Sequence, residues 1–129
     1  MISGTVEFPS MRDDMIYYLE RLQDEDFQRK AWVEKNFENG QTPFDDIIHF
    51  FFDDTKLSQD PSDCIGAFLL NEEEADAIRA VTSNIDLMVE HHGWKDTDAE
   101  HLDLPEWPAI VEAARRAHAL ISPGTPPLE

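Results

Sequence analysis

Residues 71–93 read NEEEADAIRAVTSNIDLMVEHHG, and this stretch decides the fold. Asn71 is a residue type that caps helix N-termini, and three glutamates follow it, where the positive end of a helix dipole stabilises acids. Apolar residues then repeat with helical spacing at Ile78, Val81, Ile85, Met88 and Val89. Gly93 is a typical stop, because glycine adopts the left-handed conformation that ends many helices. The stretch therefore predicts an amphipathic α-helix, the longest in the chain.

Toward the N-terminus, similar signals predict a pair of helices. The first covers about residues 11–23, where apolar side chains recur at spacings of three and four. The second starts at Asp24 or Asp26 and ends at Asn39-Gly40. We expect the two to form a helical hairpin.

A further helix is predicted to start at Thr42-Pro43 and to end near Asp54-Thr55. The Thr42 hydroxyl is a candidate cap, and Pro43 suits the first helical position. Three consecutive phenylalanines, at positions 50–52, make this helix apolar most of the way round. We therefore expect it in the centre of the core.

Shorter elements and one more long helix complete the predicted fold. Asp60-Pro61 opens a short buried helix through Leu70, with a strand as the alternative and Gly66 at a close approach. A single turn is expected at 97–100, and a last helix begins at 105–108. The prediction is an all-α single-domain bundle of about five main helices and one or two short ones. Residues 1–9 form an extended N-terminal segment and residues 122–129 a flexible proline-rich tail.

Charge is the unusual feature of the composition. The 129 residues include 10 basic and 28 acidic ones, for a net charge of -18. Before Ile65 there are 6 basic and 15 acidic residues and afterwards 4 and 13, so each half carries -9. Nucleic acid and anionic membranes would be repelled, whereas a basic protein would be attracted. The alternative that involves no partner is that the charge serves solubility alone.

Other features place the chain in the cytoplasm. Cys64 is the only cysteine, so no internal disulfide can form, and its apolar neighbours indicate a small buried hydrophobe. The N-terminal residues lack the basic and apolar regions of a signal peptide. No apolar run approaches the length of a membrane span.

Two kinds of candidate site emerge from the side chains. One is a metal site on the third helix, because Asp45, His49 and Asp53 recur every four residues, with Asp54 alongside. The interpretation without metal is that an acid holds His49. The other is a partner-binding surface, with candidates at Asp53, Asp54, Glu72, Glu73, Glu74 and Trp94. We find no phosphate loop, nucleophile elbow, H-E-x-x-H or Cys-x-x-Cys motif, so no catalytic residue and no cofactor are assigned.

Several segments resemble a family of small acidic uncharacterised bacterial proteins of about this length. They are Met11-Arg12, Arg29–Val33, His49–Thr55, Asp60-Pro61, Ile65-Gly66, Asn71–Ala75, Pro105–Trp107 and Val111–Ala117. The resemblance runs from about Met11 to Ile121 and implies no activity or site residue. Size and acidity are similar to those of immunity proteins, by analogy only.

Three functions therefore remain open. The first is a non-catalytic module that binds a basic protein, as an immunity-type or antitoxin-like neutraliser. The second is a small metal-dependent enzyme or metal-binding protein that uses Asp45, His49, Asp53 and Asp54. The third is a structural or regulatory helical homodimer.

Overall fold

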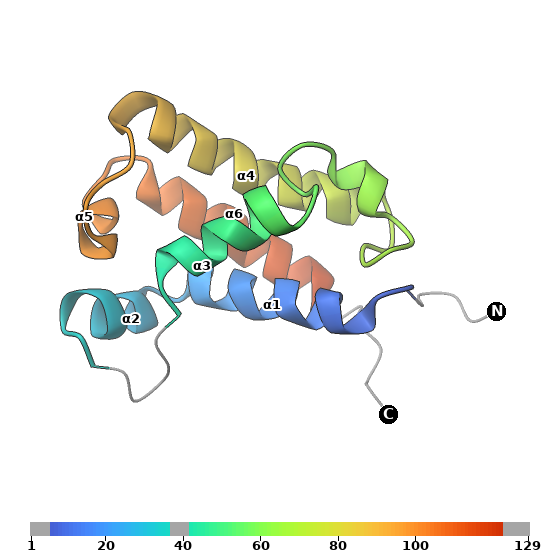
Figure 1. The fold of residues 1–129 in the computed structure, drawn as a ribbon, viewed down its shortest axis with the longest axis horizontal. Coiled ribbons are helices and arrows are strands. Elements are labelled where there is room, and N and C mark those ends of the chain that lie inside the picture. The colour runs from blue at the N-terminus through green and yellow to red at the C-terminus, as the bar shows by residue number, and fades with distance from the viewer. Residues whose placement is uncertain (1–5, 37–41, 123–129) are drawn as a thin grey trace.

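Three long helices form the body of the molecule, in a computed structural model that describes residues 6–36 and 42–122. They are α1 (Pro9–Gln23), α4 (Glu72–His92) and α6 (Trp107–Ile121). Helix α6 packs against both α1 and α4, so it lies between them (Figure 1). Helix α4 is the longest, as the sequence predicts.

Two further helices begin with α-helical turns and continue as π-helices. Helix α2 (Glu25–Gln28) runs into η1 (Arg29–Val33), and α3 (Phe44–Ile48) runs into η2 (His49–Asp54). The short elements are the 3₁₀ turn η3 (Pro61–Cys64) and α5 (Asp98–Leu102). The described part of the chain contains helices and no β-strand, so the predicted all-α single-domain bundle is confirmed.

Helix ends follow the predicted capping signals at several positions. The Asn71 side chain accepts a hydrogen bond from the Glu74 N–H at 2.9 Å, and Gly93 ends α4 with φ of 70°. Asp24, rather than Asp26, caps α2 by accepting from the Phe27 N–H at 3.0 Å. The predicted ending at Asn39-Gly40 lies outside the described residues.

The start of α3 differs from its prediction. Thr42 does not cap this helix, because its hydroxyl hydrogen-bonds to the Tyr17 hydroxyl on α1. The first N–H of the helix, that of Phe44, instead donates to the Asp98 carboxylate from α5 at 3.2 Å. The cap therefore comes from a residue distant in sequence.

The segment after η3 is neither the expected helix nor a strand. Ile65 and Leu69 form an isolated bridge around a turn. The Gly66 and Ala67 carbonyls accept hydrogen bonds from Glu7 and Phe8 of the N-terminal segment, at 2.9 and 2.7 Å, so they are not available to a helix. Gly66 is needed for its φ of 90°, and no close approach explains it, because an added Cβ would meet nothing within 4 Å.

Aromatic side chains make up one end of the core. Trp32, Phe44 and Trp107 are buried and contact one another with ring centroids 5.2–5.9 Å apart. The buried His101 ring packs on Phe44 at 4.8 Å. The third tryptophan, Trp94, is 56% exposed, so it is the tryptophan that a partner can reach.

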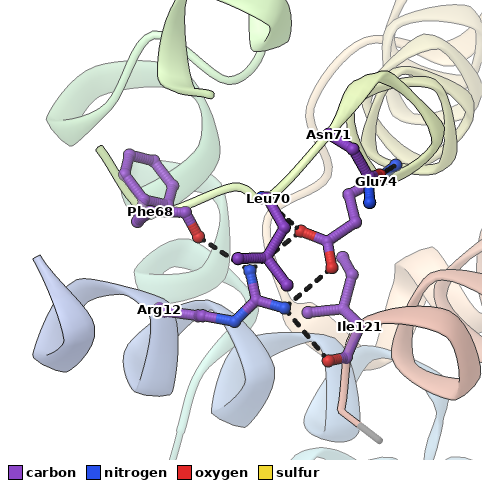
Figure 2. A network of polar contacts seen from close by, with 6 residues as sticks. All are labelled: Arg12, Phe68, Leu70, Asn71, Glu74 and Ile121. Atoms are coloured by element: carbon purple, nitrogen blue, oxygen red, sulfur yellow. Dashed lines mark hydrogen bonds and ion pairs between the residues drawn. The ribbon is translucent and has the colours of Figure 1, made fainter. Parts of the chain in front are cut away.

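A buried ion pair and its hydrogen bonds join four parts of the chain at the other end of the core (Figure 2). Arg12 on α1 binds both carboxylate oxygens of Glu74 on α4, at 2.8 and 2.7 Å. Arg12 also donates to the carbonyls of Phe68 and Ile121, at 2.9 and 3.2 Å. Glu74 accepts a further bond from the Leu70 N–H at 2.8 Å. The two charged residues are only 1% and 2% exposed, so this pair is an internal tie.

Candidate binding groove

A groove of about 390 Å³ lies between α3/η2 and the C-terminal half of α4. We call it the acidic groove. Its apolar floor and its polar rim come from the same two helices. The floor consists of Ile48, Phe52, Ile85 and Val89, and the rim of Asp45, His49, Asp53 and Asp86; the exposed Trp94, which follows α4, completes the lining.

Helical periodicity explains why apolar and acidic side chains lie in adjacent rows. On α3/η2, Asp45, His49 and Asp53 are spaced by four residues, and they form a row next to Ile48 and Phe52. On α4, Ile85 and Val89 are one turn apart, with Asp86 beside them. Gly93 ends α4, and the Trp94 ring that follows contributes to the groove.

His49 is held by two carboxylates, as the interpretation without metal expects. Its Nδ1 lies 2.5 Å from the Asp53 carboxylate and its Nε2 lies 3.3 Å from that of Asp45. The hydrogen bond with Asp53 and the charge of Asp45 raise the pKa of His49 above its ordinary 6.5. The two carboxylates thus favour the protonated, cationic form of His49 on one wall of the groove.

The metal candidates are only partly brought together. Both ring nitrogens of His49 face carboxylates, and Asp54 does not line the groove. Within the described ranges, no group of three or more His, Cys, Asp and Glu side chains is placed to hold a metal ion. The arrangement is a hydrogen-bonded acid–histidine–acid row on an exposed helix face.

Asp86 is the acid on the opposite wall. Partial loss of hydration and, to a smaller extent, the charge of Glu90 one turn further on raise its pKa above the ordinary 3.8. Among the described residues, no basic group pairs with Asp86 in the way that His49 pairs with Asp53. The carboxylate therefore carries a charge that an incoming cation would stabilise.

The structure does not bring the partner-binding candidates together. Asp53 and Trp94 line the groove. Glu72 and Glu73 are exposed in the first turn of α4, at the far end of this helix from the groove. Glu74 is buried against Arg12, so it is removed from the candidate surface. Asp54 is exposed beside the groove without lining it.

A second acid–histidine cluster joins the end of α4 to the start of α6. His91 Nδ1 and His92 Nε2 lie 2.6 and 2.7 Å from the two oxygens of Glu106. These contacts, that with His91 foremost, hold the pKa of Glu106 below its ordinary value. Both histidines thus share one carboxylate, and the cluster connects two helices.

The fold and the groove together define an acidic helical bundle with a hollow on one face. A comparison with protein families then assigns the chain to a family. The family described as Domain of unknown function (DUF7945) matches residues 6–125, so the chain belongs to this family. The expectation of an uncharacterised family that spans nearly the whole chain is thereby confirmed. A search of curated proteins and a search of solved structures each found no match. None of the helices in the described ranges is long and apolar enough to cross a membrane.

Proposed function

We propose that the protein is a non-catalytic binding module that docks a basic protein partner on the acidic groove, as an immunity-type or antitoxin-like neutraliser. The observation that carries the proposal is the combination of an apolar floor, a rim of three carboxylates and an exposed tryptophan in one hollow. Tryptophan is enriched among the residues that dominate binding energy at interfaces. The size and acidity of the whole protein are similar to those of bacterial immunity proteins.

The net charge supports the same function at longer range. A charge of -18 would steer a basic protein toward the molecule and raise its association rate. Such steering is screened by salt within about 8–10 Å at physiological ionic strength. Binding of the partner is therefore expected to weaken as the salt concentration rises.

The metal-dependent alternative competes for the same atoms. A metal ion bound by His49 would have to displace the Asp45 or Asp53 carboxylate from the imidazole. Docking a partner needs no such rearrangement on α4, where Asp86 and the floor residues already line the groove. The geometry thus supports a docking surface better than a metal centre.

The test is capture of a partner by the immobilised protein at low salt, in parallel with matched variants. Asp86→Asn and Trp94→Ala alter the groove, whereas Glu73→Gln removes one exposed charge from the far end of the same helix. We expect the wild type and Glu73→Gln to retain one and the same basic protein, which a salt step releases. The groove variants should retain much less of it.

Two results would contradict the proposal. One is equal retention by Asp86→Asn, Trp94→Ala and the wild type, which would place the contact elsewhere. The other is a partner whose binding does not change between low and high salt. Light scattering on the free protein shows whether either result is due to self-association, because a homodimer has twice the mass of one chain.

A further inference from the structure

The size of the acidic groove limits what can enter it. One turn of an α-helix with its side chains is about 10–12 Å wide and 5.4 Å long, so it occupies roughly 400–600 Å³. The groove of about 390 Å³ is open to one side, so long side chains of a partner can fill it while the rest of the partner lies outside. The partner is expected to present a side chain to it and to rest its backbone outside.

The lining selects an amphipathic cation. Apolar atoms of Ile48, Phe52, Ile85 and Val89 form the floor, and carboxylates from both helices form the rim. Lysine and arginine bury an aliphatic stem on apolar surface and keep the charged group at a polar edge. A neutral apolar side chain would bring no counter-charge to the Asp86 carboxylate, and a short polar one would not cover the floor.

An exposed indole favours arginine over lysine, and so does a carboxylate that has no basic partner in the described ranges. The planar guanidinium stacks flat on aromatic rings and binds a carboxylate through two parallel hydrogen bonds. An ammonium is also attracted to a ring face, but it is a compact point charge without the planar fork. Trp94 provides the ring and Asp86 the carboxylate on the wall opposite His49. We propose that the groove is an arginine pocket, which takes the side chain of an arginine from the basic partner; this inference rests on the proposed function.

Both binding modes already occur inside this chain. The Arg21 guanidinium lies over the rings of Tyr17 and Phe27, with its central carbon 4.9 and 4.5 Å from their centroids. Arg12 binds the Glu74 carboxylate through two parallel contacts. The groove offers the same two kinds of group, an aromatic ring and a carboxylate, to an arginine from outside.

The test uses three short blocked peptides that differ at one position, which is arginine, lysine or citrulline. Citrulline has the shape of arginine without its charge. Trp32 and Trp107 are each only 2% exposed, so a saturable change in tryptophan fluorescence reports on Trp94. Amide chemical shifts in NMR spectra locate the peptide independently.

We expect the arginine peptide to bind with saturation and to shift the amides of the groove. The lysine peptide should bind several-fold more weakly, and the citrulline peptide should not saturate. Asp86→Asn should weaken the arginine peptide about three-fold, as for an exposed ion pair, and Glu73→Gln should leave it unchanged. Trp94→Ala, followed by NMR, should weaken it about two- to five-fold through the lost ring contact.

Equal binding of the arginine and citrulline peptides would overturn the arginine pocket, as would equal losses in Asp86→Asn and Glu73→Gln. The failure of this inference is distinct from the failure of the proposed function. If Asp86→Asn abolishes partner capture while no arginine peptide binds, the docking surface stands and the arginine pocket is wrong. If the groove variants capture the partner as well as the wild type does while the arginine peptide binds in the groove, the proposed function is wrong.

Discussion

Removing one half of the buried ion pair between Arg12 and Glu74 should destabilise the fold more than any surface change. In Arg12→Met, the Glu74 carboxylate stays buried at 3% side-chain exposure and loses both guanidinium contacts. Of the contacts described for the Glu74 carboxylate oxygens, only the hydrogen bond from the Leu70 N–H remains. An uncompensated buried charge of this kind costs about 3–5 kcal/mol.

The expected shift in melting temperature follows from the chain length. Unfolding entropy is about 2.1 cal/mol/K per residue, so 129 residues give about 0.27 kcal/mol/K. A loss of 3–5 kcal/mol then lowers the Tm by roughly 10–20 °C. Thermal unfolding followed by far-UV circular dichroism measures this shift directly.

Two further variants separate buried charge from lost packing. Arg79→Met removes a cation of the same type from the exposed pair with Asp76, and we expect a loss of about 0–1 kcal/mol. The double variant Arg12→Met/Glu74→Leu removes both buried charges, so it should be more stable than Arg12→Met. A Tm of Arg12→Met within about 3 °C of the wild type would refute the reasoning. So would a double variant whose loss equals the sum of the losses measured for Arg12→Met and for Glu74→Leu alone.

Three other predictions concern a helix cap and two histidine–carboxylate contacts. Asn71→Ala removes the cap of α4, and urea unfolding should show a loss of about 1 kcal/mol; an unchanged midpoint would contradict the capping role. Glu106 has a lowered pKa, so its contribution to stability is full above its ordinary pKa and is lost as the pH falls through the lower folded value. Glu106→Gln should therefore flatten the acid limb of a plot of Tm against pH, and an identical limb would show that the contact with His91 and His92 is without effect. His49 has a raised pKa and loses its charge as the pH rises through that value, so the arginine peptide should bind more tightly at higher pH. In His49→Gln this increase should vanish, and its persistence would assign the pH dependence to another group.

The helices were predictable from local signals, whereas their partners were not. Asn71, the glutamates after it and Gly93 define α4 within one stretch of sequence, so its bounds could be predicted. The contact between Arg12 and Glu74 joins residues 62 positions apart, and no local pattern indicates it. For this reason Glu74 was predicted as a surface acid and proved to be buried.

The candidate site shows the same division. The spacing of Asp45, His49 and Asp53 predicts that they share one helix face, and in the structure His49 contacts both acids. The opposite wall, with Asp86, depends on how α3/η2 lies along α4, which periodicity within one helix does not determine. The sequence contained one signal for this wall. Asp86 directly follows Ile85, a core residue in the apolar stripe of α4.

The most direct test of the docking surface is an NMR map of the captured basic partner on the isotope-labelled protein. If the account is correct, the largest amide shifts on addition of the partner will lie along the groove, at Ile48, Phe52, Ile85, Val89 and Trp94. The buried Trp32 and the first turn of α4 will shift little. Shifts centred instead on the hollow between α2/η1 and α5, near Val33 and Leu102, would contradict the central claim.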